Sequence, residues 1–233
     1  MARALVLGGP LSPIGWRVGF LHQPFEVARR ATLDWWTALV GVDALRLRDV
    51  PGGDLLGALR LLDPLQTPPY RQLLVGSDTG WTAHFMNNHL GGDSVSWTGH
   101  LSRVLGCEAV VATHIPVGDY VYPTTGFDLL GPTGEPPLSY LRSVHAGVEA
   151  RNRWTFQTRG AVQSFEAPER YGAPRVRDRL TRELLIRYLG ALGIEPDRET
   201  WWSDALVIEQ STGQRGREST VEETRHEYGI RET

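Results

Sequence analysis

The chain has 233 residues, 41% hydrophobic content and a formal net charge of -3, enough for one large domain with a sizeable core. The single cysteine excludes an internal disulfide and a structural zinc cluster of thiolates, and the absence of lysine excludes Schiff-base chemistry and a Walker A loop. The negative net charge argues against nucleic acid as a partner. With no apolar run of about 18 residues and no secretory signal pattern, we expect a cytoplasmic protein without membrane contact.

The first part of the chain is predicted to contain strands and helices in alternation. Residues 16–20 have the pattern of a strand, and residues 25–40 have helical apolar spacing between Pro24 and Gly41. Residues 44–47 predict a second strand, and residues 53–62 a second helix, closed by Asp63-Pro64. The following LQTPPY segment is predicted to be a connector.

The middle of the chain predicts a hairpin followed by a helix and another strand. The turn residues of GSDTG separate two strands, at 71–75 and 80–86. Residues 94–105 have helical spacing, with Asp93 placed to cap the first turn and Gly106 to end the helix. The apolar residues of 107–114 predict a buried strand, in which Cys107 is an inert buried thiol.

Glycine, proline and threonine become frequent between Pro116 and Pro137, and GPTGEPP at residues 131–137 is predicted to be a loop. Residues 153–166 alternate around Arg159-Gly160 and predict a hairpin. The strongest apolar stripe lies in residues 174–193 and predicts one long helix, followed by a last strand at 201–209.

These elements predict the α+β class. We expect a single domain over residues 1–208 with a largely antiparallel or mixed sheet and about three or four helices packed on it. A three-layer α/β arrangement is the alternative. Residues 209–233 have few large apolar side chains and mixed charge, and predict a flexible charged tail.

The segment WTAHFMNNHLGGDSVSW and the helix after it contain side chains that bind divalent metals. These candidate ligands are His84, His89, Asp93 and His100. Their spacing matches no compact motif such as H-E-x-x-H, so they can meet at one metal ion only if the loop between strand and helix folds back. No cofactor is expected apart from this divalent-metal alternative.

The same segment contains a candidate nucleophile. Gly92-Asp93-Ser94 resembles the GDS block of the SGNH hydrolases, and over these three residues the resemblance implies that Ser94 is a catalytic serine. The chain contains no later Asp-x-x-His pair to supply the base and its orienting acid. The candidate catalytic set is therefore His89, Asp93, Ser94 and His100, with helix capping as the alternative role of Asp93 and Ser94.

Two other groups of residues are candidates for binding. In the predicted helix at 174–193, three arginines share one face and can contact an anion, or form a solvated ion-paired surface: Arg175, Arg179 and Arg182. Adjacent side chains cannot all face one core, so each tryptophan pair is expected to expose one member as a binding surface. The pairs are Trp35 with Trp36, and Trp201 with Trp202.

The missing catalytic motifs, the eight tryptophans and the slight acidity favour a non-catalytic binding protein that acts through a protein partner, in the manner of an immunity protein or antitoxin. The alternative is a small hydrolase or metal-dependent enzyme centred on the segment from His84 to His100. The two hypotheses differ in whether the side chains of that segment converge on one point.

Overall fold

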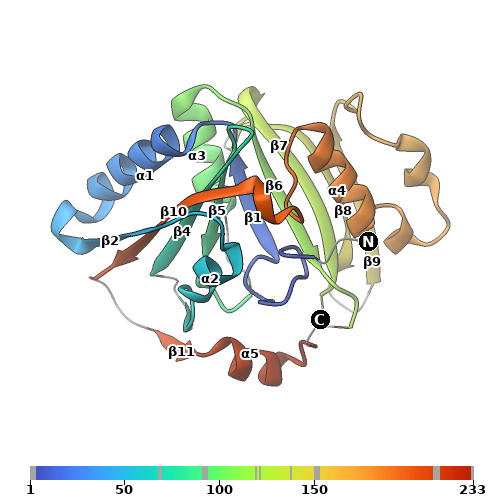
Figure 1. Ribbon diagram of the computed structural model, residues 1–233. Coiled ribbons are helices and arrows are strands. Elements are labelled where there is room, and N and C mark those ends of the chain that lie inside the picture. The colour runs from blue at the N-terminus through green and yellow to red at the C-terminus, as the bar shows by residue number, and fades with distance from the viewer. Residues whose placement is uncertain are drawn as a thin grey trace.

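An antiparallel sheet of nine strands forms the centre of the molecule in the computed structural model, in the order β2-β10-β4-β5-β1-β6-β7-β8-β9 (Figure 1). Its strands are β1 (Arg17–Leu21), β2 (Leu45–Val50), β4 (Arg71–Ser77), β5 (Thr82–Met86), β6 (Ala109–Ile115), β7 (Thr124–Glu135), β8 (Tyr140–Glu149), β9 (Arg153–Gly160) and β10 (Trp202–Gln210). The structure describes residues 4–67, 70–90, 94–118, 120, 122–136, 138–149, 153–211 and 216–231.

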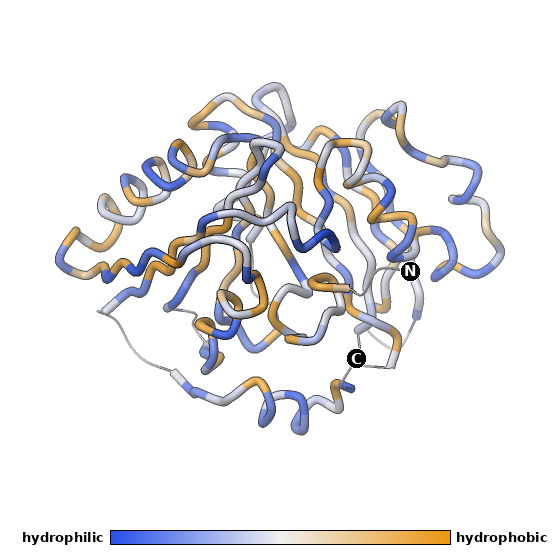
Figure 2. The backbone as a smooth tube through the Cα atoms, viewed as in Figure 1, coloured by the Kyte–Doolittle hydropathy of each residue, from blue (hydrophilic) through white to orange (hydrophobic). Residues whose placement is uncertain are grey.

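Helices pack on both faces of this sheet. They are α1 (Phe25–Val40), α2 (Leu55–Arg60), α3 (Val95–Leu105), α4 (Arg182–Ala191) and α5 (Val221–Tyr228), with short 3-10 turns at Val42–Ala44, Pro168–Gly172, Val176–Asp178 and Glu199–Trp201. On one face, α1 contacts β4, and α3 contacts β1, β6 and β7. On the other face, α2 contacts β4 and α4 contacts β7. Figure 2 shows hydrophobic and hydrophilic residues alternating along α1, as a helix with one buried side requires.

Each face of the sheet has its own hydrophobic core. Under α1 and α3 the core is small, and its buried side chains include Leu74, Trp97 and Val111. The larger core lies on the opposite face and includes Phe20, Phe127 and Tyr188, packed against residues from α2 and α4. Because α1 and α3 cover only part of their face, the strands β8 and β9 carry half-exposed and exposed polar side chains there.

The predicted antiparallel sheet with helices packed on it is confirmed, and the molecule is a single sheet-rich domain. Helices lie on both faces, as in the layered alternative, but every pair of strands in the sheet is antiparallel. The helix between Pro24 and Gly41, the hairpin around GSDTG and the last strand of the sheet are also confirmed. No helix in the described segments combines the length and the hydropathy that a membrane span requires.

The predicted loop at 131–137 is wrong over most of its length, because strand β7 continues through Glu135. This strand pairs with β6 along Ile115 to Ala109 of that strand. Its register against β8 shifts between Leu129 and Leu130 and again between Leu130 and Glu135. The predicted hairpin at 153–166 is also wrong. Residues 153–160 form the single strand β9 along β8, and the chain leaves the sheet after Gly160.

The predicted long helix at 174–193 is two separate elements, which corrects that prediction. A 3-10 turn covers Val176–Asp178, and α4 begins only after Thr181, whose side chain accepts a hydrogen bond from the Leu184 amide. A capping side chain at this position starts a new helix and interrupts the earlier one.

The segment after β10, predicted to be a charged tail, includes β11 (Arg217–Ser219) and α5. Strand β11 pairs with β3 (Leu65–Thr67), which lies in the predicted connector, and together they form a separate two-stranded sheet. A capping box between Thr220 and Glu223 starts α5. Arg225 of this helix donates from Nε to the carbonyl oxygen of Ser12, at 2.7 Å.

Candidate functional site

His84, the first predicted metal ligand, is buried inside the small core under α3. Its Nε2 lies 2.8 Å from Oε1 of Gln72, its Nδ1 lies 3.3 Å from the Ser94 hydroxyl, and its ring stacks on Trp97 at 4.5 Å. Burial lowers the pKa of His84 to about 3, so the imidazole is neutral at physiological pH. Each polar atom of the ring therefore has a structural partner.

The other members of the predicted catalytic set lie in different surroundings. His89 donates from Nε2 to the carbonyl oxygen of Arg217 at 3.1 Å, and its Nδ1 lies 3.0 Å from the Ser219 hydroxyl, so it attaches the C-terminal segment to the domain. Ser94 is buried and donates to the carbonyl oxygen of His84 at 3.2 Å; its side chain makes no capping bond to α3. Asp93 lies outside the described residues.

His100 is half-buried on α3, where its ring stacks on Trp35 of α1 at 4.4 Å. Burial and the nearby Arg103 lower the pKa of His100. In the segments that the structure describes, no three His, Cys, Asp or Glu side chains are close enough together to hold a metal ion. The structure thus brings His84 and Ser94 together and places His89 and His100 in separate contacts.

Two of the predicted binding tryptophans are buried, which corrects the expectation that each pair exposes one member. Trp201 ends a 3-10 turn and Trp202 begins β10, so the chain changes direction between them and both rings enter the larger core. The indole N–H of Trp201 donates to the Thr79 hydroxyl at 2.9 Å. Trp35 and Trp36 are each half-buried on α1.

The three predicted anion-binding arginines do not share one helical face, because the helix is interrupted before Thr181. Arg175 is exposed and precedes the 3-10 turn. Arg179 donates to the carbonyl oxygen of Ala173 and lies over the ring of Phe156. Arg182 contributes to internal structure, and its Nη2 forms an ion pair with Asp197 at 2.7 Å.

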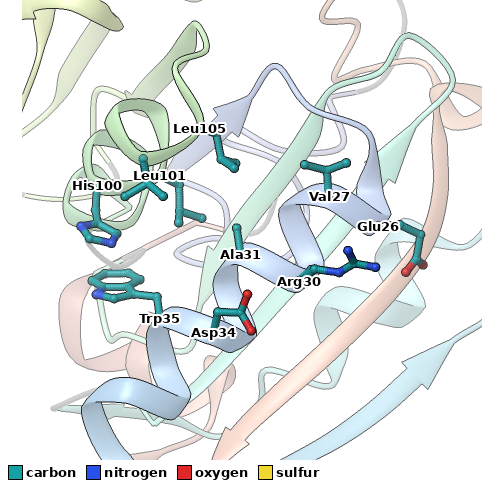
Figure 3. A pocket seen from close by; sticks show the side chains of 10 residues that line it. Glu26, Val27, Arg30, Ala31, Asp34, Trp35, His100, Leu101 and Leu105 are labelled. Carbon is teal, nitrogen blue, oxygen red and sulfur yellow. The ribbon is translucent and has the colours of Figure 1, made fainter.

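A groove of about 440 Å³ runs between α1 and α3; we call it the helix groove (Figure 3). Its lining residues are Glu26, Val27, Arg30, Ala31, Asp34, Trp35, His100, Leu101, Val104 and Leu105. Figure 3 shows the His100 ring above the Trp35 indole at one end and Glu26 near Arg30 at the other. Most of the lining side chains are apolar, and Val27 and Val104 are exposed to solvent. The groove therefore has an apolar floor, with charged side chains of α1 beside it.

A second depression of about 450 Å³ lies on the same face of the sheet, over β6 to β9; we call it the polar cleft. Its lining residues are Arg17, Val95, Thr113, Asp128, Tyr140, Ser143, His145, Gln157 and Arg159. The strand register explains why they meet: Asp128 is paired with Ser143, Ser143 with Arg159, and His145 with Gln157 on neighbouring strands. The cleft therefore contains the side chains that β7, β8 and β9 direct away from the larger core.

Asp128 is the central group of the polar cleft. Its Oδ1 accepts a hydrogen bond from the Ser143 hydroxyl at 2.6 Å and lies 2.9 Å from Nε2 of His145. The Asp128 residue is only 5% exposed, whereas the His145 side chain is 35% exposed. A buried carboxylate thus holds an imidazole that solvent and ligands can reach.

Gly126 makes the position of His145 sterically possible. The two residues are paired across β7 and β8, and a Cβ atom at position 126 would lie 2.5 Å from both Nδ1 and Cε1 of the imidazole. Any other residue at position 126 would displace the ring and lengthen its hydrogen bond to Asp128.

The remaining groups around the polar cleft are mostly hydrogen-bond donors. Arg17 donates from Nε to the Thr113 hydroxyl at 3.2 Å. Arg159 forms an ion pair with Glu135 at the exposed edge, and Gln157 donates to Glu149 at 2.7 Å. Guanidinium, amide and hydroxyl groups therefore surround one carboxylate and one imidazole.

The polar cleft is not predicted from the sequence, because neither Asp128 nor any residue of β8 is assigned to an element or a site. The informative signal is the alternation in SVHAGVE, where Val144, Ala146 and Val148 occupy one face of the strand and Ser143 and His145 the other. Two polar residues at that spacing predict a shared polar surface. Their pairing with Asp128 requires the strand register.

No family model, curated protein or solved structure matches this chain, so its function is inferred from the geometry of its own residues.

Proposed function

We propose that this protein binds a small hydroxylated carboxylate in the polar cleft, with the hydrogen-bonded pair of Asp128 and His145 as the central recognition group. The observation that carries this proposal is the 2.9 Å contact between the buried carboxylate and the half-exposed imidazole at the floor of a depression of about 450 Å³. Converging polar groups in a concave site are typical of ligand recognition.

The chemistry of the lining favours this ligand class. The guanidinium groups of Arg17 and Arg159 suit a carboxylate, and the Asp128–His145 pair together with the Ser143 hydroxyl suits ligand hydroxyl groups. Chain segments from four strands supply these groups, so their spacing is set by the sheet.

The same pair meets one requirement of general base catalysis, because a carboxylate that accepts from Nε2 fixes the imidazole with Nδ1 as its basic atom. Ser143 is not arranged as an activated nucleophile, since its hydroxyl donates to Asp128 and not to His145. The arrangement thus differs from a Ser-His-Asp relay, in which the histidine lies between the other two residues.

The test is ligand-observed NMR with a panel of small hydroxycarboxylates and a parallel panel of uncharged sugars. We expect wild-type protein to bind a hydroxycarboxylate, Asp128→Asn and His145→Ala to lose that binding, and His226→Gln, an exposed histidine on α5, to retain it. Thermal melting shows whether each variant is folded. The proposal is wrong if no hydroxycarboxylate binds, if only uncharged sugars bind, or if folded Asp128→Asn binds as the wild type does.

The helix groove supports a second candidate function, the protein-partner hypothesis derived from the sequence. Its apolar floor, the half-buried Trp35 stacked on His100, and the exposed Val27 and Val104 form a surface of the kind that receives an apolar anchor residue of a partner. The alternating charges of Glu26, Arg30 and Asp34 along α1 suit an amphipathic helix with apolar residues on one side.

The chain offers a matched pair of variants for this second function. Val104 in the groove and Leu39 outside it are both 58% exposed, so Val104→Arg and Leu39→Arg introduce the same charge at equal exposure. We expect a partner recovered by wild-type protein under native conditions to be recovered by Leu39→Arg and lost by Val104→Arg. Equal recovery by both variants, or no partner at all, would contradict docking in the helix groove.

A further inference from the structure

Four arginines surround a pocket of about 280 Å³ on the face of the sheet opposite the polar cleft; we call it the arginine pocket. Its lining residues are Arg46, Leu47, Arg48, Arg60, Leu61, Asp63, Arg71, Val207 and Glu209. They come from the edge strand β2, from β10 and β4, and from α2 and the residues after it, which lie beside the sheet in Figure 1.

The floor of the arginine pocket is fixed by Arg71. Its Nη1 donates to the carbonyl oxygens of Leu61 and Asp63, at 2.8 and 3.0 Å, and its Nη2 forms an ion pair with Glu209 at 3.3 Å. This guanidinium is only about one-sixth exposed, with a side-chain exposure of 16%. The Arg71 group and its carboxylate are therefore ordered before any ligand binds.

The carboxylates of the pocket already have partners. Glu209 pairs with Arg71, and Oδ1 of Asp63 accepts from the backbone amide of Val221 at 3.0 Å. By contrast, within the described part of the chain, the exposed guanidinium groups of Arg46, Arg48 and Arg60 make no hydrogen bond or ion pair with the protein. The pocket is therefore positive although the whole chain carries a net charge of -3.

These three guanidinium groups are held near one another by the backbone. Arg46 and Arg48 are two residues apart on β2, where both point to the face that carries Val207 and Glu209, so their Cα atoms are about 7 Å apart. Arg60 is the last residue of α2 and lines the same pocket. Four guanidinium groups and two carboxylates line the pocket, which leaves an excess of positive charge that a multivalent anion would balance.

We propose that the arginine pocket binds the phosphoryl group of a small phosphorylated ligand, with Arg46, Arg48 and Arg60 as its direct contacts and Arg71 as the fixed floor. Guanidinium groups bind phosphate oxygens through paired N–H donors, and a phosphate dianion satisfies more than one arginine at a time. A monovalent carboxylate leaves part of this charge unmatched. This site is independent of the polar cleft, which lies on the other face of the sheet.

The test is isothermal titration calorimetry at low salt with inorganic phosphate, pyrophosphate and adenosine diphosphate as probes, and acetate as the monovalent control. We expect pyrophosphate to bind and acetate not to bind. The double variant Arg46→Ala and Arg48→Ala is expected to bind pyrophosphate about tenfold more weakly or worse, because each substitution removes charged hydrogen bonds to the ligand. The double variant Arg170→Ala and Arg187→Ala removes two exposed arginines outside the pocket, so it is the matched control and should bind as the wild type does.

The three probes distinguish the source of the phosphoryl group. Tighter binding of adenosine diphosphate than of pyrophosphate identifies a nucleotide, and equal binding identifies the phosphate groups alone as the recognised feature. The proposal is overturned if no phosphate probe binds, or if the folded double variant binds as tightly as wild type. If a double variant that retains affinity also self-associates on gel filtration, the arginines of β2 protect a sheet edge and do not bind phosphate.

Discussion

Replacing His84 with glutamine should change how the stability of the protein depends on pH. In the folded protein burial lowers the pKa of this imidazole to about 3, from an ordinary value of 6.5. The folded state therefore favours neutral His84, whereas the unfolded chain takes up a proton below about pH 6.5. Stability from this residue is complete above pH 6.5 and is lost progressively as the pH falls towards the folded pKa.

The magnitude follows from the difference in proton binding. Each pH unit below 6.5 costs about 1.4 kcal/mol of unfolding free energy, which gives roughly 2 kcal/mol at about pH 5. Solvent does not screen this free-energy difference, because His84 is fully buried. Glutamine retains hydrogen-bonding capacity towards Gln72 and Ser94 but does not titrate, so His84→Gln removes this proton-linked loss whatever its own effect on stability at neutral pH.

Urea unfolding followed by the fluorescence of the eight tryptophans measures this effect. Between about pH 7.5 and about pH 5 the wild type should lose roughly 2 kcal/mol more than His84→Gln does. His226→Gln, which removes an exposed histidine, should lose as much as the wild type. If His84→Gln loses the same free energy as the wild type, the imidazole is not a buried neutral group and the structural role assigned to it is wrong.

Two further predictions concern single substitutions. The Arg142→Ala variant should be less stable by about 3 to 5 kcal/mol in urea unfolding, because Glu166, its ion-pair partner at 2.8 Å, is left buried without a counter-charge. The Arg198→Ala variant removes two exposed ion pairs, with Asp78 and Glu195, and should cost less than about 1 kcal/mol; equal losses for the Arg142 and Arg198 variants would contradict this expectation. The Gly126→Ala variant should displace the His145 ring, visible as a shift of its NMR resonance, while the protein stays folded; an unchanged His145 resonance would show that the ring has space there.

Local sequence signals predict the elements that end at distinctive residues. The helix after Pro24 and the hairpin around GSDTG are correct because proline, glycine and turn residues mark their ends, and apolar spacing specifies the buried side. The long helix at 174–193 fails for the opposite reason. Its apolar stripe continues across Thr181, but the side chain of that threonine caps a new helix, and a pattern of apolar residues does not report the break.

Strand β7 could not be predicted because its stability comes from its neighbours. Its glycines and prolines favour loops locally, but pairing with β6 on one side and β8 on the other holds the segment extended. The candidate site has the same origin. Asp128 and His145 are 17 residues apart in the chain, and only the register of β7 against β8 brings them to 2.9 Å.

The segment from Trp81 to Trp97 has the composition of a reaction centre, but the roles of its described polar residues are structural. His84 and Ser94 satisfy each other inside the small core, and His89 holds the C-terminal segment. Residue types that suggest chemistry also serve as buried hydrogen-bond partners, and burial separates the two uses. Burial is a property of the packed structure, which residue type alone does not reveal.

The most direct test of the polar cleft as a ligand site is the NMR resonance of the His145 ring during addition of the hydroxycarboxylate panel, with the signal assigned by comparison with His145→Gln. The proposed function predicts that a binding hydroxycarboxylate shifts the His145 signal and leaves that of His226 unchanged, and that Asp128→Asn abolishes the shift. The proposal is contradicted if the hydroxycarboxylates that bind leave the His145 resonance unchanged, or if they shift it equally in Asp128→Asn.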